Sequence, residues 1–197
     1  ERAVASQVGA RHAVAVSSGT AALHAAAFAA GVGPGDEVIV PAMTFVATAN
    51  AVLMAGARPV FADVDPATGN LTVATVAPHV TVRTRAIIPV HLYGLLCDME
   101  ALQAFAREQN LILIEDSAHC VEARRGTVRP GTHSDCACFS FYATKNLTCG
   151  EGGALATNDA ALAERVRRLS LHGMTTSAYE RYAGRYQHWD MPEWGWK

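Results

Sequence analysis

Short runs of β-branched and other apolar residues alternate with longer alanine-rich or amphipathic stretches along most of this 197-residue chain. This alternation is typical of β-α units, which place successive strands side by side in a mostly parallel sheet. We expect strands at 12–17, 37–40, 59–62, 85–90, 111–114, 136–141 and 154–157, and helices at 19–30, 44–55, 98–109 and 158–171. The chain is therefore predicted to be an α/β protein.

The composition excludes several classes of partner. Half of the residues are hydrophobic and 17% are charged, which suits a well-filled core. The formal net charge of −2 argues against a nucleic acid or an anionic membrane. No apolar run approaches the roughly 20 residues that a membrane-spanning helix needs. The five cysteines are odd in number and follow no disulfide-framework spacing, so we expect a reducing compartment, the cytoplasm.

Lysine is rare in this chain, which has two lysines, Lys145 and Lys197, against fourteen arginines. Lys145 lies in an apolar stretch at 139–146. Arginine cannot lose its proton in a protein, whereas lysine can, and a neutral amine is the form that attacks a carbonyl to make an imine. The alternative is a lysine whose stem packs on apolar neighbours while its ammonium reaches water.

The segment Ser17-Ser-Gly-Thr-Ala-Ala-Leu23 joins an expected strand to an expected helix. Free backbone N–H groups and hydroxyls at a helix N-terminus suit a phosphate, because the helix dipole favours negative charge there. The alternative is that Ser18 caps the helix and Gly19 makes the turn. The segment alone does not separate the two interpretations.

Asp116 closes the segment Leu-Ile-Leu-Ile-Glu-Asp, directly after the expected strand 111–114. A carboxylate at the end of a buried strand is costly unless it is paired with a cation or with donors. A protonated ring nitrogen of a ligand would be such a partner, and so would Arg124 or Arg125. Phe45 follows another strand end, where an aromatic ring either stacks on a flat ligand or packs in the core.

Lys145 is preceded by Ser140 and followed by the glycine-rich segment Gly150-Glu-Gly-Gly153. Glycines let the backbone approach a ligand or a neighbouring segment closely. Open α/β sheets bind ligands at the carboxyl ends of their strands, where all these features are expected. A phosphate site, a carboxylate, an aromatic ring and an isolated lysine together are the parts of a pyridoxal-phosphate pocket.

In order and spacing, the chain resembles the DegT/DnrJ/StrS family of nucleotide-sugar aminotransferases, which are pyridoxal-phosphate enzymes of fold type I. The resemblance implies a three-layer αβα sandwich with a mostly parallel sheet. The motifs that carry it are AVAVSSGTAAL, EVIVPAMTFVATANAV, GARPVFADVDPATGNLT, PVHLYG, LIEDSAHCVEA and FSFYATKNLTCGEGGALAT.

The resemblance also implies roles for individual residues. Lys145 matches the imine lysine and the general acid and base, Asp116 the carboxylate facing the pyridine nitrogen, and His119 a polar residue near the ring hydroxyl. Cofactor-binding positions are expected at Gly19, Thr20, Phe45, Asp116, His119, Ser140 and Lys145. No metal is expected.

The implied reaction moves an amino group from an amino acid, glutamate in most such enzymes, to a keto group of a nucleotide-linked sugar. A homodimer is also implied. Some relatives carry histidine in place of the lysine and dehydrate the sugar, so Lys145 favours transamination. We expect residues 1–173 to form the cofactor-binding large domain. Residues 174–197 are expected to form an arm toward a small C-terminal domain, with a further N-terminal segment preceding Glu1. The arm's aromatics, Tyr179, Tyr182, Tyr186 and Trp189, would cover substrate or pack on a partner.

Three alternatives compete with this interpretation. The first is a non-catalytic or regulatory protein that keeps the same cofactor pocket, and a sugar dehydratase is a variant of the enzymatic one. The second is a metal protein whose ligands would be His119, Cys120, His133, Cys136 and Cys138, although paired Cys-x-x-Cys motifs are missing. The third is a serine hydrolase, for which no Gly-x-Ser-x-Gly segment occurs. His91 would either line the sugar site or serve as a hydrogen-bonded structural residue.

Overall fold

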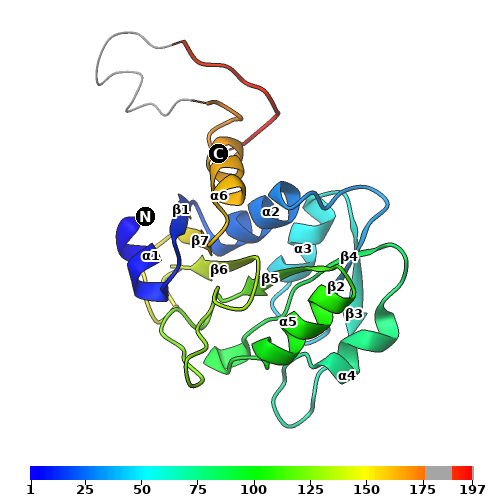
Figure 1. Ribbon diagram of the computed structural model, residues 1–197. Helices are drawn as coiled ribbons and strands as arrows, with labels where there is room; N and C mark the ends of the chain where they lie inside the picture. The colour runs from blue at the N-terminus through cyan, green and yellow to red at the C-terminus, as the bar shows by residue number, and fades with distance from the viewer. Residues whose placement is uncertain (176–187, 197) are drawn as a thin grey trace.

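The structure is a computed structural model that describes residues 1–175 and 188–196 (Figure 1). Seven strands in this part of the chain form one sheet in the order β1-β7-β6-β5-β4-β2-β3. The strands are β1 His12–Val16, β2 Glu37–Pro41, β3 Arg58–Ala62, β4 Thr84–Ile87, β5 Ile112–Asp116, β6 Cys136–Ser140 and β7 Gly153–Thr157. The α-helices are α1 Arg2–Val8, α2 Gly19–Ala29, α3 Ala47–Met54, α4 Val73–Val76, α5 Met99–Glu108 and α6 Ala160–Leu169, with 3-10 turns at Ala77–His79 and Leu92–Gly94.

The sheet is mostly parallel, as predicted. Strand β2 pairs in parallel with β3 and β4, and the parallel pairing continues from β4 through β5 to β6. Strand β7 is antiparallel to both β6 and β1. Parallel pairing brings the carboxyl ends of the central strands to one edge, so the ends of β5 and β6 lie together, with Asp116 opposite Cys138.

Helices cover both faces of the sheet, which gives three layers (Figure 1). On one face α2, α3 and α6 enclose a core of small apolar residues, including Ala22, Ala25 and Ala26, none of which is exposed. On the other face α5 packs Leu102 and Ala106 against the sheet, and α1 covers the β1–β7–β6 end. The alanines allow α2 to lie close to the sheet, which positions its N-terminus at the strand ends.

The observed boundaries differ from the predicted ones at two places that matter for the site. Helix α3 begins at Ala47 rather than at Thr44, so Thr44 and Phe45 belong to the loop after β2. Strand β5 extends through Asp116, beyond the predicted end at residue 114. The short helices α1 and α4 were not predicted, because neither carries a long enough apolar pattern.

The described end of the chain returns to the body of the protein. Trp196 stacks on His24, with ring centroids 4.2 Å apart, and meets Phe28 edge-on at 5.4 Å. Glu193 binds Arg165 and Arg168 of α6 at 3.2 and 3.1 Å. Three of the arm's aromatics, Tyr179, Tyr182 and Tyr186, lie outside the described residues, and the predicted boundary at residue 173 stays a prediction.

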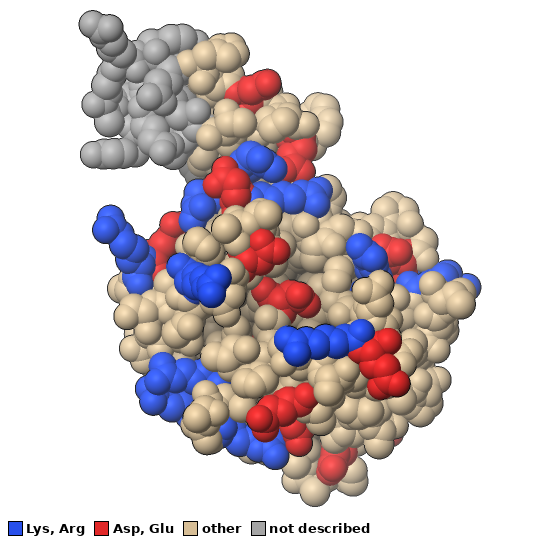
Figure 2. Space-filling view, in the orientation of Figure 1, with Lys and Arg blue, Asp and Glu red and all other residues tan. Residues whose placement is uncertain are grey.

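Acidic and basic side chains are mostly interspersed over the face shown in Figure 2. This distribution agrees with the small net charge. In the part of the chain that the structure describes, every helix is too short or too polar to cross a membrane.

A buried carboxylate, Glu37, stands at the start of β2 and is 1% exposed. It accepts hydrogen bonds from Thr81 Oγ1 at 2.7 Å, from Arg58 at 2.5 Å and from Arg83 at 2.5 and 2.8 Å. The hydrogen bonds from Thr81, Arg58 and Arg83 lower the pKa of Glu37 to about 2 from its usual 4.5. The cluster joins the starts of β2 and β3 to the loop before β4.

We predict that Glu37→Gln lowers the melting temperature at pH 7 by about 5 °C, because the two arginines lose their anionic acceptor. A carboxyl with a lowered pKa stabilises the fold fully above its unfolded value and loses that contribution as the pH falls from 4.5 toward 2. Thermal unfolding followed by circular dichroism across this range measures the effect. The exposed Glu108→Gln is the matched control. Equal acid sensitivity of wild type and Glu37→Gln would contradict the assignment.

Candidate active site

A pocket of about 590 Å³ opens at the carboxyl ends of the central strands. It collects side chains from the N-terminus of α2, the loop after β2, the turn after β4 and the ends of β5 and β6. All seven predicted site residues line it, namely Gly19, Thr20, Phe45, Asp116, His119, Ser140 and Lys145. Ser18, Thr44, Tyr93, Tyr142 and Glu151 also contribute to its wall. The structure therefore brings every predicted residue together, and their roles stay predictions.

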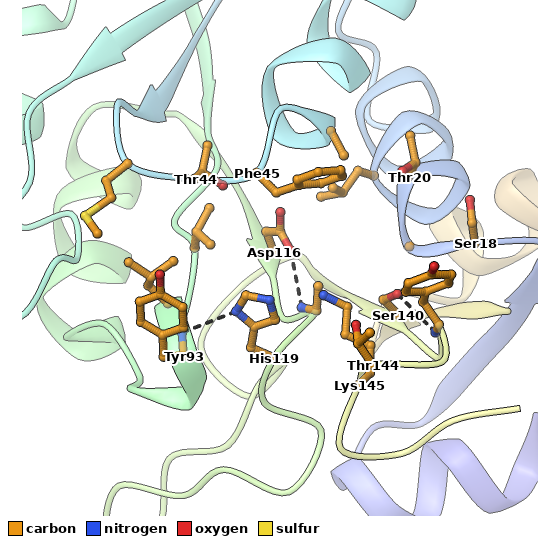
Figure 3. A pocket seen from close by; sticks show the side chains of 18 of the residues that line it. Ser18, Thr20, Thr44, Phe45, Tyr93, Asp116, His119, Ser140, Thr144 and Lys145 are labelled. Atoms are coloured by element: carbon orange, nitrogen blue, oxygen red, sulfur yellow. Dashed lines mark hydrogen bonds between the residues drawn. The ribbon is translucent and has the colours of Figure 1, made fainter. Parts of the chain in front are cut away.

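The N-terminus of α2 forms the end of the pocket near Ser140 (Figure 3). Ser18 caps the helix, since its Oγ accepts a hydrogen bond from the Ala21 amide at 3.1 Å. The amides of Gly19 and Thr20 have no acceptor among the described residues. Ser18 therefore uses only the Ala21 amide for capping, and the Gly19 and Thr20 amides remain available to bind an anion. The capping and anion-binding interpretations are compatible.

Two glycines allow this end of the pocket to close. A Cβ on Gly19 would lie 2.8 Å from the Cβ of Ser140, so α2 and β6 approach each other only with glycine at this position. A Cβ on Gly153 would lie 2.4 Å from the carbonyl of Ser18 and 2.7 Å from the Gly19 nitrogen. Gly153, the last glycine of the segment beginning at Gly150, therefore lets β7 pack directly against the backbone of the Ser18–Gly19 turn.

Asp116 is 5% exposed and lies at the centre of the pocket (Figure 3). Its Oδ2 accepts a hydrogen bond from Thr48 Oγ1 at 2.8 Å and its Oδ1 one from the Ala118 amide at 3.2 Å. Burial raises the pKa of the Asp116 carboxyl, and these two hydrogen bonds oppose that rise. The predicted alternative of an ion pair with Arg124 or Arg125 is wrong, since Arg125 binds Asp98 instead, at 3.5 Å.

Phe45 is 72% exposed, so the alternative of a core phenylalanine is also wrong. The ring lies across the pocket from Lys145, on the far side of Asp116 (Figure 3). Exposing a whole aromatic ring is unfavourable by roughly 25 cal/mol per Å² of apolar surface. A flat ligand inserted beneath the ring would cover that surface.

Lys145 is half-buried and extends into the pocket from the loop after β6, close to His119 (Figure 3). The Nδ1 atom of His119 accepts a hydrogen bond from the Tyr93 amide at 3.3 Å, which leaves the proton on Nε2. Burial, and then the charge of Lys145, lower the pKa of His119. His119 is therefore a neutral ring that presents an N–H group to the pocket.

His91 does not line the pocket, and the structural interpretation holds. It is fully buried, with Nε2 bonded to Glu115 Oε2 at 2.6 Å. Its Nδ1 accepts a hydrogen bond from the Cys97 amide at 3.2 Å. Glu115 is satisfied further by the Gly131 amide at 2.8 Å and by Ser134 Oγ.

The residues considered for a metal site do not converge. Within residues 1–175 and 188–196, no group of three or more His, Cys, Asp or Glu side chains is placed to hold a metal ion. Cys120, Cys136 and Cys138 are buried free thiols. Burial raises the pKa values of Cys120 and Cys138, as expected of inert core thiols.

Sequence reasoning did not select Tyr93, Thr44 or Thr48. Tyr93 is 81% exposed, and its ring lies parallel to that of His119 with centroids 6.0 Å apart. Tyr93 follows a strand end in the segment 89–94, and this position is the sequence signal that indicates a pocket residue. Thr44 lies in the loop before α3 and Thr48 in its first turn, and the two Oγ1 atoms approach to 2.8 Å, a contact that no helical spacing in the sequence marks.

Comparison with known proteins agrees with this site. A sequence model of the DegT/DnrJ/EryC1/StrS aminotransferase family matches residues 1–192. The spore coat polysaccharide biosynthesis protein SpsC of Bacillus subtilis is 50% identical over 93% of this chain and 47% of SpsC. The GDP-perosamine synthase of Caulobacter vibrioides is 49% identical over 88% of this chain and 47% of the synthase. The X-ray structure of the aminotransferase from Psychrobacter cryohalolentis superposes with a TM-score of 0.92 and 36% identity, over 100% of this chain and 50% of that one.

The chain belongs to the DegT/DnrJ/EryC1/StrS aminotransferase family. It spans about half the length of the curated relatives that it matches. The cofactor that the family indicates is pyridoxal phosphate. The pocket fits this group, because it combines unpaired amides for a phosphate, an exposed aromatic ring, and a buried carboxylate that no cation contacts among the described residues.

We predict that Gly153→Ala weakens pyridoxal-phosphate binding about tenfold, because the new methyl group displaces the Ser18–Gly19 turn. Absorbance titrations with pyridoxal phosphate and with pyridoxal, which lacks the phosphate, measure the effect. Binding of pyridoxal is expected to change much less. Gly33→Ala is the matched control, since a Cβ there meets no atom within 4 Å. Equal weakening for both ligands would show that Gly153 does not act through the phosphate end.

Proposed function

We propose that this chain carries the cofactor site of an aminotransferase that moves an amino group from an amino acid, glutamate in the first instance, to a keto group of a nucleotide-linked sugar. The observation that supports this most directly is Lys145 lining the same pocket as Asp116, His119 and an unpaired helix N-terminus. The similarity to a GDP-perosamine synthase supports a nucleotide sugar as the acceptor class.

When bound, pyridoxal phosphate supplies an aldehyde that carries the amino group and a ring that withdraws electrons. The amides of Gly19 and Thr20, with the Ser140 hydroxyl, would bind the phosphate. Phe45 would cover one face of the ring and exclude water there.

Three side chains would control protons. Asp116, as a carboxylate, would keep a proton on the ring nitrogen through a charge-assisted hydrogen bond. His119 would donate its Nε2 hydrogen to the ring hydroxyl. The amine of Lys145 would take a proton from the substrate carbon and return it at a neighbouring atom, acting as general base and then general acid.

A homodimer and a cytoplasmic location complete the proposal. Apolar side chains around the pocket mouth are exposed, and a second copy of the chain would cover them. They are Met43, Phe45, Tyr93 and Tyr142. The five unpaired thiols fit a reducing compartment.

We predict that borohydride reduction in the presence of pyridoxal phosphate labels Lys145 alone, as read by peptide mass mapping. Lys145→Ala should abolish the label, and transamination should fall by at least about 10³-fold. Lys197→Ala removes the other lysine of the chain and should leave the label unchanged. A label that survives Lys145→Ala would overturn the assignment.

The transfer reaction is tested separately with 15N-glutamate and a panel of nucleotide-linked keto sugars, followed by mass spectrometry. Release of 2-oxoglutarate and a 15N-labelled amino sugar are the expected products. A protein that labels at Lys145 yet releases no 2-oxoglutarate would be the non-catalytic cofactor binder considered above. Loss of the sugar hydroxyl without 15N transfer would indicate a dehydratase.

A further inference from the structure

Two threonine hydroxyls connect the pocket surface to the buried carboxylate of Asp116. Thr48, in the first turn of α3, has no exposed surface, and its Oγ1 donates to Asp116 Oδ2 at 2.8 Å. The Oγ1 atoms of Thr48 and Thr44 are also 2.8 Å apart. Thr44 lines the pocket beside Phe45 (Figure 3). The three side chains form a continuous chain of hydrogen bonds from the pocket wall to the carboxylate.

The donor and acceptor of each of these hydrogen bonds follow from the number of hydrogens that each group carries. A hydroxyl has one hydrogen, and an ionised carboxylate only accepts. Thr48 uses its single hydrogen on Asp116, so the hydrogen between the two threonines must come from Thr44. Thr44 then presents only lone pairs to the pocket. If Asp116 were protonated, its own hydrogen could point to Thr48, the chain could reverse, and Thr44 could donate to a ligand.

We propose that Thr48 is a positioning residue that keeps Asp116 ionised and turned toward the pocket, with Thr44 completing the hydrogen-bonded chain. This inference rests on the proposed function, in which Asp116 holds a proton on the cofactor's ring nitrogen. Each carboxylate oxygen accepts one hydrogen bond from the protein, from Thr48 or from the Ala118 amide, and keeps a further lone pair for that task.

Thr48 also ties Asp116 to Phe45. The Thr48 amide donates to the Phe45 carbonyl at 3.1 Å. One residue therefore contacts both the carboxylate at the ring nitrogen and the backbone of the residue that would cover the ring. A substitution that removes the Thr48 hydroxyl keeps the hydrogen bond from the Thr48 amide to Phe45. Such a variant therefore tests the contact with Asp116 separately from the contact with Phe45.

The electrostatic surroundings favour a role for this hydroxyl. Burial raises the pKa of Asp116, and the Thr48 hydrogen bond is the first of the interactions that lower it, ahead of the Ala118 amide. The other titratable groups that face Asp116 are His91, His119, Cys120 and Cys138. Lys145 acts on His119. None of these groups is altered by a change at Thr48.

The test uses the cofactor-free chain with 13C-labelled aspartate carboxyls, titrated by NMR, with Asp116→Asn to assign the signal. Thr48→Val keeps the side-chain shape and removes the hydroxyl, and we expect Asp116 to bind its proton about tenfold more tightly. Thr48→Ser keeps the hydroxyl and loses the methyl group, so its titration should match wild type. Thr44→Val should shift in the same direction by a smaller factor. If Thr48→Val does not fold, Thr48→Ala provides the same comparison.

A second measurement follows the affinity for pyridoxal phosphate at pH 7. Thr48→Val should weaken binding about tenfold, while Thr48→Ser stays within about twofold of wild type. An Asp116 titration unchanged in Thr48→Val, or shifted equally in Thr48→Ser, overturns the inference even if Lys145 is labelled normally. A shifted titration with unchanged cofactor affinity also overturns it. Failure of Lys145 to bind the aldehyde would instead overturn the proposed function, since the NMR titration contains no cofactor.

Discussion

The site depends on a carboxylate that is buried at the end of a central strand with no cation beside it among the described residues. Asp116 is held in place by the parallel pairing of β5 with β6, which fixes the edge of the sheet at which it emerges. Taking an ionised carboxylate out of water is costly, and one hydroxyl and one amide offset only part of that cost. A positively charged group entering from the pocket would stabilise it further. Under the proposed function, this partly compensated carboxylate of Asp116 favours a ligand whose ring is protonated.

The end of the pocket at the N-terminus of α2 shows the complementary arrangement. There the unpaired groups are donors, the Gly19 and Thr20 amides, and the favoured ligand is an anion. A ligand that satisfies both ends must carry a cation-like ring atom and an anionic group on one rigid frame, as pyridoxal phosphate does. The close packing of Gly153 and Ser140 against the α2 turn fixes the position of the donor end.

Much of this could be predicted from sequence, because local patterns carried the relevant information. Strand ends and helix starts are visible in the apolar runs, so the sequence alone predicts Asp116, Phe45, Gly19 and Lys145 at one edge of the sheet. The start of α3 was placed too early, because the composition of residues 44–46 resembles that of the helix that follows. The Thr48–Asp116 hydrogen bond spans 68 positions in the sequence and arises only from tertiary packing, so no local pattern could reveal it.

The adjacent carboxylates Glu115 and Asp116 show how the fold separates an acid of the core from an acid that lines the pocket. Successive side chains of a strand point to opposite faces of the sheet, so the two acids enter different environments. The Glu115 carboxylate is hydrogen-bonded to His91, to the Ser134 hydroxyl and to the Gly131 amide, so its partners all lie within the protein. Asp116 meets fewer donors and faces the pocket. No Lys, Arg or His side chain of the described residues forms an ion pair with Asp116, whose carboxylate accepts hydrogen bonds from Thr48 and the Ala118 amide, so under the proposed function the ligand supplies the cation.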